Sequence, residues 1–158
     1  HHAVMRSIDR WLPIHRAYSI DEWAIRLTGP DRELDRATDL AQRIKRQIRE
    51  DFSPWLPCSV GIAPTRLLAK IACELQKPDG LTALMLHDLP DRLEHLRLSE
   101  LTGIASGMVK RLETHGVRTI CDLWALTRDE SVRAWGSVAG ADWWAGFHGI
   151  DEPEAPTR

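Results

Sequence analysis

The spacing of apolar side chains predicts two amphipathic helices in the first half of the chain. Between residues 31 and 51, apolar positions recur at the three-to-four-residue spacing of one helix face. These positions are Leu34, Ala37, Ala41, Ile44 and Ile48. A second stripe follows Pro64-Thr65, a typical helix start, and consists of Leu67, Leu68, Ile71, Ala72 and Leu75. We expect this helix to end at Lys77-Pro78-Asp79-Gly80, because proline and glycine interrupt helices.

Shorter apolar segments predict β-strands around these helices. Residues 15–28 are rich in aromatic and branched side chains and end at the stop signal Gly29-Pro30. Residues 57–63 and 81–86 are short apolar segments on either side of the second helix. The order strand, helix, strand, helix, strand predicts an α/β (α+β) layer.

The character of the chain changes after His87. Short helical pieces follow without a strand pattern, and they are separated by Gly103, Gly107, Gly116 and Gly136. The sequence therefore predicts an α/β domain over residues 1–87 and a small all-α domain over residues 88–158.

Composition narrows the function only slightly. The chain has 158 residues, of which 43% are hydrophobic and 28% charged, as in many globular domains. The net charge of −2 argues mildly against nucleic-acid binding, although local patches decide phosphate contacts. Cys58, Cys73 and Cys121 are far apart in the sequence, so we expect small buried residues and neither a disulfide framework nor a zinc site.

The chain has no pattern typical of membrane insertion or secretion. No apolar run approaches the roughly 18 residues of a membrane span, and the first residues lack a leader pattern. We therefore expect a cytoplasmic protein. His1 and His2 are either native or the remnant of a purification tag, and they carry no weight in the fold prediction.

Two adjacent carboxylates, Asp21 and Glu22, interrupt an aromatic and aliphatic segment. Neighbouring carboxylates repel each other unless a cation or solvent compensates. Successive side chains of a regular strand point to opposite faces, so a shared site requires a tight turn at about residues 19–22. The residues alone leave two alternatives, a metal site or a solvated hairpin tip, and both place the pair close together and exposed.

The sequence Tyr18-Ser19-Ile20-Asp21-Glu22 closely resembles the Y-S-I-D-E motif of Y-family (UmuC/DinB-type, translesion) DNA polymerases. The resemblance implies that Asp21 and Glu22 help to bind two Mg²⁺ ions, which activate the primer 3′ hydroxyl and bridge the incoming triphosphate. Mg²⁺ prefers such hard oxygen ligands. Trp23 replaces the small residue that usually follows the glutamate.

Three basic residues, Arg66, Lys70 and Lys77, share one face if the second helix is extended through residue 77. A solvated helix face would carry the same pattern. The surrounding sequence, from Ser59-Val60-Gly61-Ile62-Ala63 to Lys77-Pro78-Asp79-Gly80, is similar to a conserved block of the same polymerase family. The resemblance assigns Lys77 to the triphosphate of the incoming nucleotide, with Lys70 as the second candidate and Arg66 as a weaker one.

The glycine-punctuated segment from Leu101 to Leu123 resembles a helix-hairpin-helix, the element that binds the DNA backbone in Y-family thumbs. The resemblance implies DNA-backbone contacts by Gly103, Ala105, Gly107 and Lys110. Ala105 replaces the second glycine of the usual turn. Trp143, Trp144 and Phe147 could stack on bases, but their helical spacing favours a place in the thumb core.

The resemblance extends from about residue 18 to residue 152 and implies the architecture and the partners. It implies a partial palm with an incomplete ferredoxin-like sheet over residues 1–87 and a thumb over residues 88–158. The partners would be primer-template DNA and a deoxynucleoside triphosphate, with a sliding clamp bound through further parts. Complete enzymes contain another palm strand with a metal-binding Asp and a fingers domain, so we expect a fragment that is inactive alone.

A noncatalytic accessory protein of the ImuB kind is the alternative function. Such proteins have typically lost the catalytic acids, whereas this chain retains Asp21 and Glu22. An isolated helix-hairpin-helix module would leave residues 18–86 unexplained.

Overall fold

The computed structural model describes residues 2–9, 14, 16–19 and 21–151, and they form a mixed α/β structure. The chain divides into two compact units. The first unit comprises His1–Ile62 and Ala72–Ala83, and the second comprises Ala63–Ile71 and Leu84–Arg158. One dividing point lies inside helix α3 (Arg66–Leu75), so this helix contributes residues to both units.

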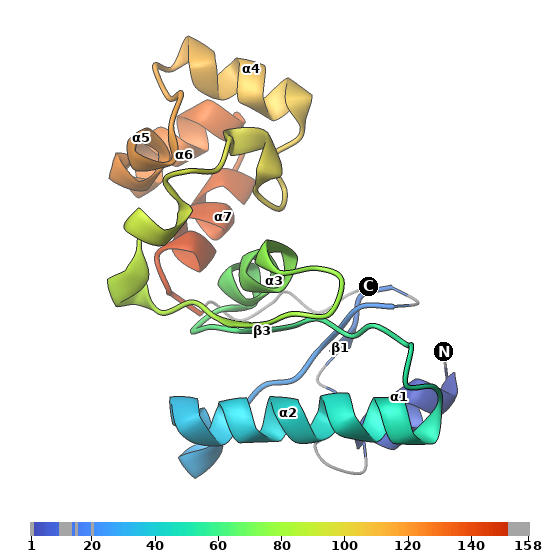
Figure 1. The fold of residues 1–158 in the computed structure, drawn as a ribbon. Helices are drawn as coiled ribbons and strands as arrows, with labels where there is room; N and C mark the ends of the chain where they lie inside the picture. The colour runs from blue at the N-terminus through green and yellow to red at the C-terminus, as the bar shows by residue number, and fades with distance from the viewer. Residues whose placement is uncertain (1, 10–13, 15, 20, 152–158) are drawn as a thin grey trace. The chain divides into compact units, whose positions relative to one another are not determined.

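The first unit contains two small sheets and two helices outside α3 (Figure 1). Strands β1 (Arg16–Ala17) and β2 (Trp23–Ala24) pair antiparallel, whereas β3 (Val60–Ile62) and β4 (Leu81–Ala83) pair parallel. The predicted strand segments are thus present, but regular pairing covers only part of each one.

Helix α2 (Leu34–Asp51) has the predicted buried face. Its buried residues are Ala37, Ala41, Ile44, Lys45 and Ile48. The helix begins at Leu34, the first apolar position of the pattern, and not at residue 31, because η1 (Gly29–Arg32) forms a separate 3₁₀ turn with Pro30 near its start. All four apolar positions in that list were predicted, whereas the burial of Lys45 was not.

Helix α1 (His2–Asp9) was not predicted from the sequence. It lies beside α2 (Figure 1), and Ile8 packs in one apolar cluster with Ile44 and Ile48. Trp23, the residue that departs from the family motif, is partly buried against this cluster. The spacing of Val4 and Ile8 was the available signal, since residues four apart lie on one helix face.

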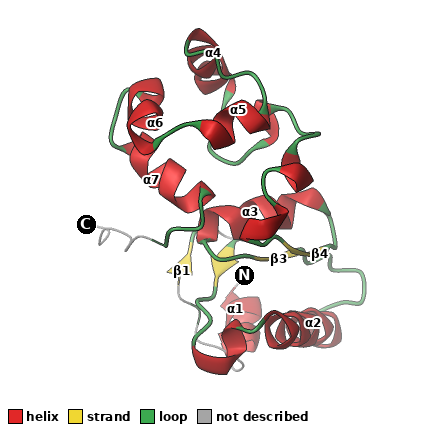
Figure 2. Cartoon of the chain, turned by 90° about the vertical axis from the view of Figure 1, so that its left-hand side faces the viewer, coloured by secondary structure: helices red, strands yellow, loops and turns green. Residues whose placement is uncertain are grey.

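The second unit is helical outside its share of α3 (Figure 2). Its 3₁₀ turns are η2 (Leu86–Asp88), η3 (Asp91–Leu93) and η4 (Leu98–Glu100), and its further helices are α4 (Ser106–Thr114), α5 (Ile120–Ala125), α6 (Arg128–Trp135) and α7 (Ala139–Phe147). Reciprocal capping boxes begin α5 at Thr119 and α6 at Thr127. These local signals define the helix starts.

The aromatic residues of α7 form part of the core of the second unit, as predicted. Phe147 is fully buried, and Trp143 packs against both Trp135 and Phe147. The Trp144 indole N–H donates to the carbonyl oxygen of Leu126 at 2.7 Å. These contacts occupy the rings in packing rather than leaving them as base-stacking surfaces.

The cysteines are less buried than expected. Cys58 and Cys73 are half-buried and Cys121 is exposed. Cys121 follows the fully buried Ile120 in α5, so it points away from the core face of that short helix. Across the described part of the chain, no helix combines the length and apolarity that a bilayer span requires.

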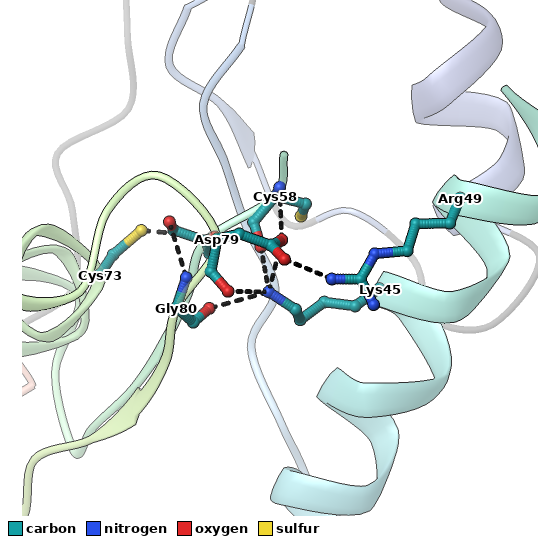
Figure 3. Close-up of polar contacts among 7 residues, drawn as sticks. Lys45, Arg49, Cys58, Cys73, Asp79 and Gly80 are labelled. Atoms are coloured by element: carbon teal, nitrogen blue, oxygen red, sulfur yellow. Dashed lines mark hydrogen bonds and ion pairs between the residues drawn. The ribbon is translucent and has the colours of Figure 1, made fainter. Parts of the chain in front are cut away.

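The first unit is joined internally by a buried lysine, Lys45 of α2 (Figure 3). Its ammonium group donates to the carbonyl oxygens of Cys58, Asp79 at 2.8 Å and Gly80 at 3.0 Å, and to Asp79 Oδ1 at 2.9 Å. The Cys58 N–H also donates to Asp79 Oδ1 at 3.1 Å, and Arg49 donates to Asp79 Oδ2. We call these five residues the Lys45 network; it links α2 to the segments that lead into β3 and β4.

The carboxylate of Asp79 should make folding acid-sensitive. Its hydrogen bond from the Cys58 N–H, followed by that from Lys45, lowers the pKa of Asp79 from 3.8 to about 2. Because the ionised form is favoured in the folded state, its contribution is complete above about pH 4 and is lost towards pH 2. The Asp79 side chain is 40% exposed, so solvent screening reduces this contribution to the order of 1 kcal/mol.

We therefore expect Asp79→Asn to flatten the decrease in unfolding free energy between about pH 4 and pH 2. Urea unfolding followed by circular dichroism at several pH values measures this decrease. Asp39→Asn is the control, because it removes an exposed ion pair with Arg43 on the same helix. An Asp79→Asn protein with the acid sensitivity of the wild type would contradict the assignment.

The close packing of α6 on α7 depends on Gly140. A Cβ atom there would lie 2.3 Å from the carbonyl oxygen of Ser131, which is backbone and cannot swing away. We expect Gly140→Ala to lower the unfolding free energy by about 1–3 kcal/mol. Gly107→Ala is the matched control: Gly107 has open space around its Cα, so alanine should be neutral or stabilising by up to about 1 kcal/mol. Equal stability of the two variants in urea unfolding would refute this explanation.

Candidate functional site

The carboxylate pair lies at the turn of the β1–β2 hairpin, as predicted. The backbone N–H of Tyr18 donates to the carbonyl oxygen of Glu22 at 2.8 Å, and that of Ser19 donates to the same oxygen at 3.3 Å. These bonds close the loop between the strands, while Ile20 lies outside the described residues. The chain therefore reverses at the position that a shared carboxylate site requires.

The two carboxylates differ in their surroundings. Asp21 is exposed, and its Oδ1 accepts a hydrogen bond of 2.6 Å from the Ser19 hydroxyl. Glu22 is half-buried, which differs from the expectation that both acids would be exposed. Glu22 directly precedes β2, whose Trp23 packs towards the apolar cluster, so the chain at this point is closer to the core.

Lys77 belongs to the same unit as the hairpin. Its ammonium group forms an ion pair with Glu74 Oε1 at 2.8 Å, and both side chains are largely exposed. The hydrogen bond to Glu74 raises the pKa of Lys77, and the negative charge of Asp21 raises it further. A mobile ammonium group therefore lies within electrostatic reach of Asp21.

The predicted basic stripe is divided in the structure. Helix α3 ends at Leu75, so Lys77 lies beyond it and does not continue the helix face of Arg66 and Lys70. The prolyl peptide and Gly80 turn the chain here, and a Cβ atom at Gly80 would lie 2.3 Å from the Gln76 carbonyl oxygen. Lys70 is half-buried and belongs to the second unit, so its role at the site stays a prediction.

Asp21 and Glu22 offer oxygen donors of the type that Mg²⁺ prefers. Within the described ranges, no cluster of three or more His, Cys, Asp or Glu side chains is arranged to hold a metal ion. Mg²⁺ usually binds through one or two carboxylates and completes its coordination with water and substrate phosphates. The donor chemistry of the pair therefore fits Mg²⁺, with the remaining ligands supplied from elsewhere.

The turn before α4 has the backbone geometry that glycine permits. Gly103 has a φ of 85°, and the neighbouring Ile104 N–H donates to the Leu101 carbonyl oxygen at 3.1 Å. The Trp143 indole N–H donates to the Thr102 carbonyl oxygen at 3.1 Å and supports the turn from the core side. Glycine is thus required at 103 by conformation.

Ala105 and the start of α4 are open to a ligand. Ala105 has a φ of −79° and a ψ of 169°, an extended conformation that alanine adopts without strain, so the loss of the second glycine does not distort the turn. Ala105 is the N-cap of α4 and provides no side-chain cap. Gly107 has no neighbour within 4 Å of an added Cβ, and Lys110 is exposed one turn later.

The residues of the Lys45 network were missed as a group by the sequence prediction. The sequence pattern does not predict the burial of Lys45, and it predicts Asp79 only as part of a helix stop. A cavity of about 340 Å³ beside α4 was also missed; its lining includes Glu94, Arg97, Glu113 and Arg118 but none of the predicted site residues. Lys45 lies four residues after Ala41 and three before Ile48, on the buried side of α2, and this helical spacing was the available signal.

Comparisons with known proteins agree with the resemblance. Residues 1–74 match the impB/mucB/samB family. DNA polymerase IV of Alkaliphilus oremlandii is 31% identical over 148 residues, which cover 94% of this chain and 36% of that protein. DNA polymerase IV of Pseudomonas aeruginosa is 32% identical over 151 residues, which cover 96% of this chain and 42% of that protein.

Solved structures share the fold over nearly the whole chain. A Y-family polymerase chimera of Dbh and Dpo4 superposes with a TM-score of 0.79 at 26% identity, covering 99% of this chain and 46% of the chimera. DinB from Sulfolobus solfataricus gives a TM-score of 0.76 at 25% identity, with 96% and 45% coverage. The chain thus spans less than half the length of these relatives. Together with the hairpin carboxylates, these matches place the chain in the Y-family (UmuC/DinB-type) of DNA polymerases.

Proposed function

We propose that this chain forms part of a translesion DNA polymerase that performs template-directed nucleotidyl transfer. The observation that carries the proposal is the hairpin at Asp21 and Glu22 with Lys77 in electrostatic reach. The named relatives are DNA polymerases, and the chain covers 36% of the first of them. The proposed activity therefore belongs to a protein that contains this chain together with further polymerase parts.

In this mechanism the hairpin presents two carboxylates to Mg²⁺. Two bound Mg²⁺ ions would stabilise the attacking 3′ oxygen and the leaving oxygen of an in-line displacement. The Ser19 hydroxyl orients the Asp21 carboxylate through its 2.6 Å hydrogen bond. Lys77 exchanges Glu74 for the triphosphate of the incoming nucleotide, acting as a mobile point charge. Lys70 is the second proposed triphosphate-binding residue.

We assign residues 1–87 to a partial, ferredoxin-like palm and residues 88–158 to a thumb with a helix-hairpin-helix. In the thumb, the turn of Gly103 and Ala105 and the start of α4 at Gly107 would accept a DNA phosphate, with Lys110 adding a positive charge. Backbone N–H groups at such turns bind phosphate with little base readout.

The proposed partners are primer-template DNA and a deoxynucleoside triphosphate, and a sliding clamp would bind through other parts of the polymerase. Several similar solved structures are binary or ternary complexes of the Dbh DNA polymerase. Because the proposed substrate is chromosomal DNA, we place the protein in the cytoplasm, at the nucleoid when it acts. An ImuB-type accessory role is not favoured, since the chain retains both acids.

Asp21→Ala and Glu22→Ala are each expected to reduce primer extension by at least about 100-fold in a polymerase that contains this chain, because each removes a metal ligand. Primer extension with Mg²⁺ measures the effect, and circular dichroism verifies folding. Asp35→Ala, which removes an exposed acid in the first turn of α2, is the control and should retain activity. Undiminished extension by either hairpin variant would overturn the metal-site assignment.

Lys110→Ala is expected to weaken binding to duplex DNA uniformly across sequences and to reduce the slope of log K against log salt by about 1. Fluorescence anisotropy of labelled primer-template at several salt concentrations measures both quantities. Arg133→Ala removes an exposed cation from α6 and serves as the matched control. An unchanged salt slope for Lys110→Ala would exclude this phosphate contact.

A further inference from the structure

The turn at residues 77–80 carries a lysine and an acid only two residues apart. If Lys77 binds a triphosphate, the carboxylate of Asp79 is a nearby negative charge that opposes the ligand. A phosphate-binding turn therefore needs either a neutral residue at 79 or an arrangement that turns the carboxylate away and neutralises it. The structure contains such an arrangement.

Asp79 is directed to α2, where it meets two cations of one helix face (Figure 3). Its Oδ1 accepts from Lys45 and from the Cys58 N–H, and its Oδ2 accepts from Arg49. The Lys45 side chain is 9% exposed, so water competes little for its ammonium group. The negative charge of Asp79 is thus compensated on the side of the turn that faces α2.

The same contacts fix the backbone of the 77–80 turn, which carries Lys77. Lys45 also donates to the carbonyl oxygens of Asp79 and Gly80, and the Gly80 N–H donates to the Ser59 hydroxyl at 3.3 Å. Gly80 packs so closely on Gln76 that no Cβ atom fits. The turn is therefore held from both ends, while the Lys77 side chain itself remains exposed. The negative charge of Asp21 acts on the Lys77 ammonium group and contributes to raising its pKa.

We propose that Asp79 is a positioning residue for triphosphate binding: its hydrogen bonds with Lys45, Arg49 and the Cys58 N–H hold the 77–80 turn that carries Lys77. This inference rests on the proposed role of Lys77. Asp79 contacts no ligand in this scheme and acts only through Lys77. Arg49 and Lys45 complete the arrangement by removing the charge that would repel the phosphates.

The test is a titration of the 158-residue chain with a deoxynucleoside triphosphate and Mg²⁺, followed by NMR shifts of backbone amides, which detect weak binding. Asp79→Ala removes the acceptors and is expected to weaken triphosphate binding about fivefold to tenfold. Asp79→Asn keeps an oxygen acceptor for Lys45 and the Cys58 N–H, and binding should remain within about twofold of the wild type.

A double-mutant cycle separates positioning from general loss of structure. In the Lys77→Ala background, Asp79→Ala should cause no further loss of affinity, because its effect passes through Lys77. Should Asp79→Ala weaken binding equally in both backgrounds, or Asp79→Asn bind as poorly as Asp79→Ala, the positioning role is wrong. Asp39→Ala on the exposed face of α2 is the control and should bind like the wild type.

The proposed function and this inference fail in different ways. A wild-type chain whose amides around Lys77 do not respond to the nucleotide would overturn the role of Lys77 and with it the positioning by Asp79. A wild-type response that Asp79→Ala leaves unchanged would overturn the positioning alone. If Asp79→Ala unfolds the chain, Arg49→Gln replaces it, since the Arg49 side chain is 39% exposed and contacts only one oxygen of the Asp79 carboxylate. Arg49→Gln is then expected to weaken triphosphate binding about twofold or more, and to have no such effect in the Lys77→Ala background. Unchanged triphosphate binding by Arg49→Gln would overturn the proposal.

Discussion

The first unit depends on the need to satisfy one buried ammonium group. Removing a lysine from water is costly unless hydrogen bonds and an opposite charge replace its hydration. Lys45 meets this requirement with three backbone carbonyl oxygens and one carboxylate oxygen, all contributed by residues 58 and 79–80. Those segments lie 13 to 35 residues away in sequence, so the ammonium group can be buried only after α2 and both strand entries have come together.

The position of the Lys45 network explains how the short parallel pair of β3 and β4 can support the turn that bears Lys77. Each of β3 and β4 pairs over only three residues, and a pair of this length is weak without support. The Lys45 network fixes the residues just before both strands, and the Val60 N–H donates to the Gly80 carbonyl oxygen at 3.0 Å. Register is therefore set at the strand entries, next to the turn that bears Lys77.

The parts of the fold that follow local rules could be predicted, whereas the parts set by distant contacts could not. The apolar stripe of α2 and the turn at Asp21 are encoded within a few residues, and both are present. The burial of Lys45 depends on Asp79, 34 residues later, and no periodic pattern links the two. Likewise, α1 is short and gains its stability from packing on α2 rather than from a strong pattern of its own.

The candidate site shows the same division between features that local sequence predicts and features that distant contacts determine. Sequence similarity predicts roles for Asp21, Glu22 and Lys77, but it could not predict that the negative charge of Asp79 would be compensated by cations of α2. Nor could it show that α3 ends before Lys77, which removes this lysine from the helix face of Lys70. A lysine on a turn can approach a phosphate as a mobile charge, whereas a lysine on a helix is confined by its neighbours. A fixed backbone under an exposed lysine side chain therefore suits the triphosphate-binding role that we propose for Lys77.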